Sequence, residues 1–255
     1  MRKTLLKALL GGSIFAASAF AGTAHAVDIN GTEVSVGIGA DYVSQYVFRG
    51  ISFADDSLQP YVEAGIGNFT LGLWANAPLG DNADDGTDEI DLYASYGFGL
   101  ADGVSASVGI TYYHFPETGD FFETDGGTAG TYEVNAGVSF DETLLSPFAT
   151  AYYDFTLESF TLEGGIGYGL DTGERSQLNA GLTAGFVETD GGTDYEYATL
   201  GAGYSFSLTD DAALTASVNY TINSESQLNF EDIIRADRLA DAQLLWFGIG
   251  LSAGF

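Results

Sequence analysis

The chain has 255 residues, and its 36 acidic and 7 basic side chains give a net charge of −29 at pH 7. With 45% hydrophobic and 14% aromatic residues it can bury a core, which excludes a disordered acidic tail, while the negative charge excludes an ordinary nucleic-acid binder. The absence of cysteine excludes disulfides, thiolate metal clusters and a cysteine nucleophile.

The first 26 residues have the three parts of a secretory signal peptide. A cationic start over 1–7 is followed by a small and apolar run over 8–22 and by an A-x-A cleavage site ending at Ala26. A membrane anchor is the weaker alternative, because the run is shorter than a spanning helix needs and is broken by glycine and serine. We predict a signal peptide over 1–26 and a mature β-barrel domain over 27–255.

From Glu33 onward, apolar residues alternate with polar residues or glycine, and this period of two predicts β-strands. Ten segments are clear, and those near 58–67 and 147–155 are weaker. The expected strands, in chain order, are 34–42, 58–67, 69–76, 90–96, 104–112, 132–140, 147–155, 160–168, 178–186, 200–206, 214–222 and 245–255.

Three features favour a membrane barrel over an exported soluble sandwich. The apolar faces carry no charge in mid-strand, and short connections alternate with longer ones, apart from a short link between the seventh and eighth strands. Aromatic residues gather near the strand ends, as in two membrane-interface belts. They are Tyr96, Phe98, Phe140, Tyr168, Tyr204 and Phe206 before short turns, and Tyr42, Tyr112, Tyr153, Phe186 and Tyr220 near the opposite ends.

The fold class is therefore predicted as all-β, an antiparallel transmembrane β-barrel of about 12 strands with short periplasmic turns and longer extracellular loops. We expect it in the outer membrane of a Gram-negative bacterium, in contact with lipid and lipopolysaccharide. The terminal Phe255 closes an alternating strand and resembles the signal read by the barrel assembly machinery.

The opposite parity of each strand then predicts the lumen, and many of its positions are glycine or serine, which leaves room for a narrow water-filled channel. The predicted pore-lining residues are Asp41, Gln45, Arg49, Tyr61, Glu63, Trp74, Glu89, Asp91, Tyr93, Glu133 and Glu163. Inward acids outnumber inward arginines, which favours cations. Acids in the long loops have alternative roles in solubility, in a saline habitat or in bridging divalent ions to lipopolysaccharide.

Arg49 is the one basic residue that we place inside, on the first strand. We expect it to form a buried ion pair with Asp41, Glu63 or Glu89, and a contact with a passing solute is compatible with that role.

The last long connection, 223–241, reads as a short helix over 229–239. We predict that Phe230, Arg235 and Arg238 narrow the mouth of the barrel; the alternative is a surface helix on the rim.

Catalytic and cofactor signals are weak. His114 is the only histidine of the mature chain, and no serine lies in a nucleophile elbow, so we expect no enzyme, no cofactor and no metal site. An outer-membrane hydrolase that uses His114 is the less favoured alternative.

The segment Asp41-Tyr-Val-Ser-Gln-Tyr-Val-Phe-Arg-Gly-Ile-Ser52 resembles the TorF-type porin family of proteobacteria. The resemblance continues in Gln59-Pro60, Leu71-Gly-Leu-Trp74 and Glu89-Ile-Asp-Leu-Tyr93. It implies an outer-membrane channel, linked in some members to uptake of small osmolytes such as trimethylamine N-oxide, and it singles out Tyr46, Arg49 and Trp74.

Together these observations predict a porin-like passive diffusion channel for small polar solutes or cations. The alternative is a non-conducting structural or adhesive barrel whose acidic loops bind divalent cations or a partner.

Overall fold

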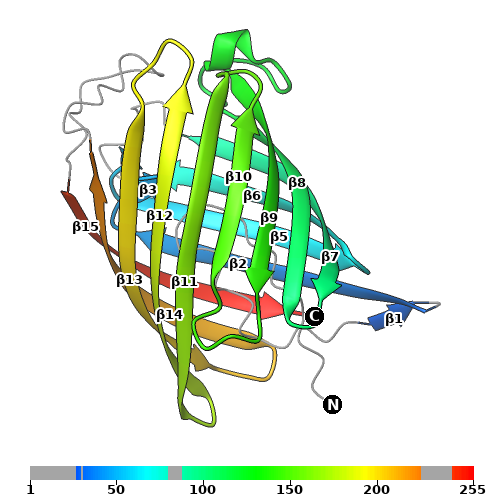
Figure 1. The fold of residues 1–255 in the computed structure, drawn as a ribbon. Coiled ribbons are helices and arrows are strands. Elements are labelled where there is room, and N and C mark those ends of the chain that lie inside the picture. The colour runs from blue at the N-terminus through cyan, green and yellow to red at the C-terminus, as the bar shows by residue number, and fades with distance from the viewer. Residues whose placement is uncertain (1–26, 30, 80–87, 225–242) are drawn as a thin grey trace.

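Antiparallel strands close into a barrel in the computed structural model, which describes residues 27–29, 31–79, 88–224 and 243–255 (Figure 1). The sheet has thirteen strands, of which β1 (Val27–Ile29) pairs only with β2, so that twelve strands form the closed wall. These twelve are β2 (Thr32–Val43), β5 (Ser57–Ile66), β6 (Phe69–Pro78), β7 (Glu89–Ala101), β8 (Val104–His114), β9 (Gly130–Phe140), β10 (Phe148–Asp154), β11 (Ser159–Gly173), β12 (Ser176–Thr189), β13 (Tyr195–Ser207), β14 (Ala212–Asn223) and β15 (Gln243–Gly254).

Each wall strand pairs with its neighbour in the chain, and β15 pairs with β2 to close the circle. Both the predicted fold class and the predicted strand number are therefore confirmed. Within the described residues, no helix has the length and hydropathy of a membrane-spanning helix. A 3-10 turn, η2 (Asp125–Gly127), lies between β8 and β9.

The two ends of the barrel differ in their connections. One end, called here the turn end, holds the connections 67–68, 102–103, 141–147, 174–175 and 208–211, together with the pairing of β1 and the chain terminus at Phe255 (Figure 1). At the other end, called the loop end, lie 44–56, 115–129, 155–158 and 190–194, together with the ends of β6 and β14 and the starts of β7 and β15. The alternation of short and long connections is as predicted, including the short link between β10 and β11.

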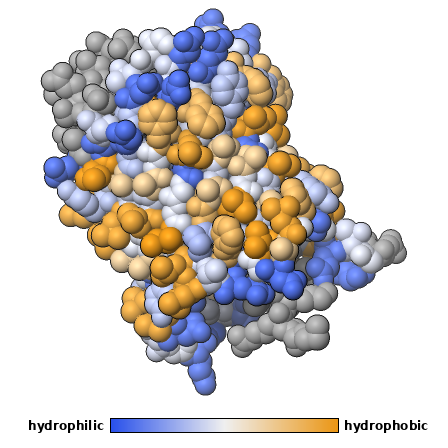
Figure 2. All heavy atoms as spheres, in the orientation of Figure 1, coloured by the Kyte–Doolittle hydropathy of each residue, from blue (hydrophilic) through white to orange (hydrophobic). Residues whose placement is uncertain are grey.

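Large apolar side chains cover the outside of the wall, at the parity that the sequence predicted. Leu200 on β13, Leu71 on β6 and Ile110 on β8 are 59%, 47% and 47% exposed although they lie in mid-strand. Figure 2 shows such residues gathered across the middle of one face, with hydrophilic residues toward both ends. A soluble protein rarely exposes so continuous an apolar band.

The inside of the wall changes character between its two ends. Toward the turn end the inward positions are largely glycine and serine, as in Ser35 opposite Gly65 and Gly97 opposite Ser107. Toward the loop end they carry buried polar side chains such as Asn76 and Thr221, which are 2% and 0% exposed. The lumen therefore narrows toward the loop end.

A separate two-stranded hairpin occupies part of the lumen at the loop end. It consists of β3 (Tyr46–Phe48) and β4 (Ile51–Ala54), which pair only with each other. Arg49 and Gly50 form its turn, with φ of 46° and 86°, and two successive positive φ values are typical of the tight type I′ turn.

The predicted placement of Gln45 and Arg49 on the first wall strand is wrong, because β2 ends at Val43. Val47 and Phe48 are consecutive large apolar residues, so a strand that continued through them would point one into the polar lumen. The chain instead folds back, and Gln45 lies half-buried in the bend before the hairpin.

The connection 115–129 folds against the outside of the barrel. Phe122 donates its backbone N–H to the Tyr112 hydroxyl, and Phe121 packs on the His114 ring with centroids 4.2 Å apart. Tyr112 and His114, which point outward, are thereby reduced to 4% and 3% exposure. The predicted membrane-interface position of Tyr112 is therefore wrong, because Phe121 and Phe122 cover it.

Candidate functional site

The hairpin 46–54 lies inside the loop end of the barrel and is held there partly by apolar packing. Its Ile51, 3% exposed, packs with inward side chains of β12 and β13, and its Val47 packs with the end of β2 and the start of β15. The wall residues in these two clusters are Val187, Tyr195 and Tyr197, and Val43, Leu244 and Trp246. The hairpin buries these inward apolar side chains, which would otherwise be exposed to water in the lumen, and their burial stabilises its docking.

Tyr46 anchors the first strand of the hairpin to the wall strands β6 and β7. Its hydroxyl donates to Glu89 Oε2 at 2.9 Å, and its ring lies 5.4 Å from that of Trp74. Burial and the nearby carboxylates of Glu89 and Asp91 raise the pKa of the Tyr46 hydroxyl well above its usual value. The tyrosine therefore stays neutral and keeps its proton for Glu89.

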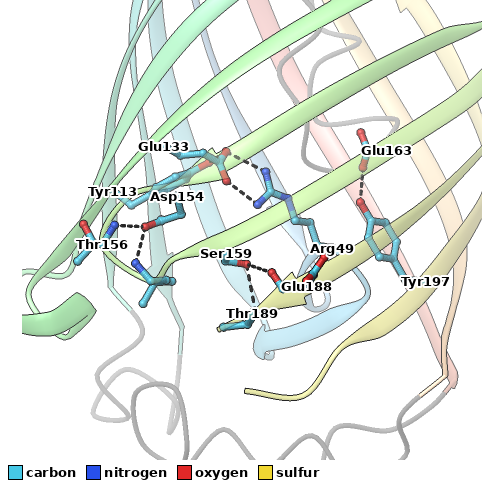
Figure 3. Close-up of polar contacts among 11 residues, drawn as sticks. Arg49, Tyr113, Glu133, Asp154, Thr156, Ser159, Glu163, Glu188, Thr189 and Tyr197 are labelled. Atoms are coloured by element: carbon cyan, nitrogen blue, oxygen red, sulfur yellow. Dashed lines mark hydrogen bonds and ion pairs between the residues drawn. The ribbon is translucent and has the colours of Figure 1, made fainter. Parts of the chain in front are cut away.

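Arg49, at the tip of the hairpin, reaches the far side of the lumen. Its Nη1 and Nη2 atoms donate to Oε2 and Oε1 of Glu133 at 2.6 and 2.8 Å, which is a bidentate pair (Figure 3). The guanidinium carbon lies 4.4 Å from the ring centroid of Tyr152 on β10 and 4.6 Å from that of Phe48. Two aromatic faces and one carboxylate therefore surround the charge.

The ion pair is buried, since the Arg49 side chain is 9% exposed and that of Glu133 is 3% exposed. Burial lowers the pKa of the Arg49 guanidinium, but the charge of Glu133 and its hydrogen bonds outweigh it and hold that pKa well above the usual value. Tyr113 on β8 also donates its hydroxyl to Glu133 Oε1, at 3.0 Å, and so fixes the carboxylate. The predicted partners Asp41, Glu63 and Glu89 are therefore wrong, and the partner is Glu133.

Gly50 completes the attachment of the hairpin. Its carbonyl accepts a hydrogen bond from Asn223 Nδ2 at 2.8 Å, and its backbone lies so close to Tyr197 that an added Cβ would be 2.5 Å from the Tyr197 Cβ. Only glycine fits at this contact, where φ is also positive. On the same wall, the Tyr197 hydroxyl donates to Glu163 Oε2 at 2.5 Å (Figure 3).

Acidic side chains line one part of the wall and are absent from the rest. Those that are buried or half-buried are Asp41 on β2, Glu63 on β5, Glu89 and Asp91 on β7, Glu133 on β9, Asp154 on β10 and Glu163 on β11. Glu33 and Asp171, at the same parity, are exposed near the turn end. The inward positions of β12 to β15, as the structure describes them, carry no charged residue, and at the same level they present Thr183, Thr199, Asn219 and Thr221. The lumen is therefore acidic on one side and neutral on the other.

The other predicted pore-lining residues also lie at inward positions. Tyr61 and Tyr93 lie over Gly39 and Gly72, where the absent Cβ leaves space for the two rings. Tyr93 donates to Glu63 Oε2 at 3.0 Å. Two atoms that line this side, Asp41 Oδ2 and Gln45 Oε1, are buried without a hydrogen-bond partner.

Sequence reasoning missed the apolar half of this site. Tyr152, Val187, Tyr197, Leu244 and Trp246 all lie inside, and none of them is among the predicted pore-lining residues. Strand parity already placed them inward, and this was the signal that an apolar segment had to cover them.

Other predicted features are not part of the site or fall outside it. The predicted loop constriction, Phe230, Arg235 and Arg238, lies outside the described residues, as does the predicted signal peptide 1–26. In the described part of the chain, no cluster of three acidic or histidine side chains could hold a metal ion. His114 lies under Phe121 on the outer face, with its Nδ1 atom 3.2 Å from the Ala129 carbonyl oxygen.

The closed wall defines a twelve-stranded antiparallel barrel, an architecture also found in porins. The solved KdgM porin matches with a TM-score of 0.55 and 13% identity, covering 86% of this chain and 99% of that one. The NanC porin matches with a TM-score of 0.54 and 12% identity, covering 86% and 98%. At these identities the likeness establishes a shared fold.

The sequence itself places the chain in a family. It belongs to the family described as "Bacterial protein of unknown function (Gcw_chp)", whose model matches residues 25–250. A second KdgM structure, described as a complex with disordered oligogalacturonate, matches with a TM-score of 0.54 and 12% identity over 87% of this chain and 99% of that one. No curated protein sequence matches the chain.

Proposed function

We propose that residues 27–255, after export and removal of the signal peptide 1–26, form a porin-like channel in the outer membrane of a Gram-negative bacterium. In this proposal the chain is of the TorF type that the segment 41–52 resembles, the short turns face the periplasm and the longer loops face the exterior. Its solutes are small polar molecules, with a preference for cations.

The proposal rests on the difference in polarity between the outer and inner faces of the closed wall. Apolar side chains in mid-strand are about half exposed on the outside, while the inward positions are largely polar or glycine apart from the residues packed against the hairpin. A wall of this kind satisfies its backbone hydrogen bonds internally and offers hydrocarbon an apolar surface, as a bilayer requires. The architecture shared with the KdgM and NanC porins supports the same assignment.

The charge of the lumen supports the preference for cations. Seven buried or half-buried acidic side chains line the wall from β2 to β11, and the hairpin brings one guanidinium to them. Carboxylates along a pore favour cations and repel anions. A polyanion such as the oligogalacturonate of the KdgM complex would meet repulsion here.

Measurement in planar lipid bilayers tests the proposal. We expect the purified protein to give discrete conductance steps, and a reversal potential under a KCl gradient that corresponds to preferential permeation of K⁺. Glu63→Gln, which removes one carboxylate from the wider part of the lumen, should shift this potential toward zero. Bilayers that stay silent for both the parent and Arg49→Ala, or a preference for chloride, would contradict the proposal.

A non-conducting structural or adhesive barrel is the second candidate, and the docked hairpin favours it because the hairpin fills the loop end of the lumen. In that case the bilayer stays silent for the parent and also for Arg49→Ala, which releases the hairpin tip. Steps that appear only in Arg49→Ala would indicate a channel that the hairpin closes.

Assembly is a further part of the proposal. The backbone of Phe255 pairs with Val36 in both directions, at 2.8 and 3.0 Å, and its side chain is 59% exposed. We propose that the barrel assembly machinery reads this outward ring, and that lipid and lipopolysaccharide surround the finished wall. Phe255→Ala should lower the amount of assembled barrel in outer-membrane fractions, and an unchanged amount would oppose this role.

A further inference from the structure

We infer that the wall around Glu133 is a binding site for guanidinium groups, that Arg49 occupies it when the hairpin is docked, and that guanidinium-bearing solutes compete with Arg49 for it. The inference rests on the proposed channel function and names a solute class for it.

The wall supplies a complete receptor for a guanidinium group. Both oxygens of Glu133 accept from the two terminal nitrogens, at 2.6 and 2.8 Å, and Tyr113 holds the carboxylate in place at 3.0 Å. The ring of Tyr152 lies 4.4 Å from the guanidinium carbon. All three wall residues belong to barrel strands, so they stay in place whatever the hairpin does.

This geometry favours a guanidinium over an ammonium group. A guanidinium is a planar fork whose two N–H groups match the two oxygens of a carboxylate, and its flat face stacks on an aromatic ring. An ammonium group is a compact charge that is more strongly hydrated and offers no parallel pair of donors. The site therefore selects by shape as well as by charge.

The resident Arg49 is an imperfect occupant. It takes a positive φ of 46°, which is uncommon for a residue other than glycine, and its buried Nε atom has no hydrogen-bond partner. A free solute carries no such backbone constraint.

The hairpin that carries Arg49 can leave without opening the wall. Strands β3 and β4 form a sheet of their own, and β2 pairs directly with β5 and β15 behind them. Departure of the hairpin therefore costs no hydrogen bond between wall strands, although it breaks those of Tyr46 with Glu89 and of Asn223 with Gly50. It would free the loop end of the lumen for the solute that caused it.

Binding is tested first, without any need for conduction. The purified Arg49→Ala barrel in detergent is heated with millimolar methylguanidinium chloride or methylammonium chloride, two cations of equal charge. We expect methylguanidinium to raise the unfolding temperature and to bind about tenfold more tightly than methylammonium. Glu133→Gln in the same background should abolish the difference, whereas Glu63→Gln, which removes a carboxylate elsewhere in the lumen, should preserve it.

A second measurement keeps Arg49 in place and so avoids any loss of folding in Arg49→Ala. The chain has no cysteine, and Val47 of the hairpin is 6% exposed, so a maleimide reacts with Val47→Cys only when the hairpin leaves its site. We expect methylguanidinium, and not methylammonium, to accelerate this reaction. Equal effects of the two cations in both measurements would overturn the inference.

The bilayer separates this inference from the proposed function. Conductance without any preference for methylguanidinium would leave the channel standing and remove the guanidinium site. A clear preference in the binding measurements, with bilayers that stay silent for both the parent and Arg49→Ala, would leave the site standing and remove the channel.

Discussion

Loss of the Glu133 carboxylate should release the hairpin from the lumen. In Glu133→Gln the Arg49 guanidinium, whose side chain is 9% exposed, would remain inside without a counter-charge. Breaking a buried ion pair from one side costs about 3–5 kcal/mol. Because the glutamine oxygen can still accept one of the two hydrogen bonds, the lower figure of about 3 kcal/mol applies, which lowers the docking equilibrium of the hairpin ~100-fold.

The maleimide reaction of Val47→Cys measures this equilibrium directly, since its rate follows the fraction of undocked hairpin. We expect the rate in Glu133→Gln to rise ~100-fold over that of Val47→Cys alone. Glu63→Gln removes the same charge from the lumen, but Glu63 accepts its hydrogen bond from Tyr93, which lies outside the hairpin. This variant should therefore change the labelling rate little. A rate in Glu133→Gln within about threefold of the parent would refute the argument that this ion pair holds the hairpin.

Three further predictions concern packing and the membrane face. Ile51→Ala, which empties a buried position of the hairpin, should weaken docking by about 2–4 kcal/mol and also raise the Val47→Cys labelling rate. Gly72→Ala should destabilise the barrel by about 1–3 kcal/mol in urea unfolding, because the new methyl group meets the Tyr93 ring. Gly167→Ala is the control, since an added Cβ there has no atom within 4 Å, and it should not destabilise the barrel. Equal effects of the two variants would contradict the contact with Tyr93. Leu200→Arg in mid-strand should cost about 2–4 kcal/mol in vesicles and Leu144→Arg at the turn end about 0–1, so equal costs would oppose a bilayer around the wall.

The sequence was sufficient for the wall of the barrel because one rule governs every wall strand. Side chains such as Leu71, Ile110 and Leu200 face the outside of the wall, and their neighbours in the sequence face the lumen. Because the two environments differ in polarity, a period of two appears along every wall strand. Even the two weaker segments were found in this way, at Ser57–Ile66 and Phe148–Asp154. The alternation of short and long connections then indicated at which end of the barrel each strand begins.

The same rule fails where the chain leaves the wall. Tyr46, Val47 and Phe48 are packed on both sides by protein, so no alternation marks them, and Arg49 was assigned to a strand that had already ended. Its true partner, Glu133, is 84 residues away in sequence and was correctly placed inside, but nothing local couples the two. Only the apolar residues at inward parity, Val187 and Trp246 among them, indicated that something lay across the lumen.

The seam between β2 and β15 has a consequence for how the barrel can form. It pairs Gly37 with Gly254 and therefore joins segments from opposite ends of the polypeptide. Contacts of such high sequence separation form slowly, since a very long loop must close before they contribute. Until they form, two unpaired strand edges and an apolar outer surface are exposed and can self-associate. We therefore expect the chain to need a chaperone that prevents aggregation until β15 has paired with β2.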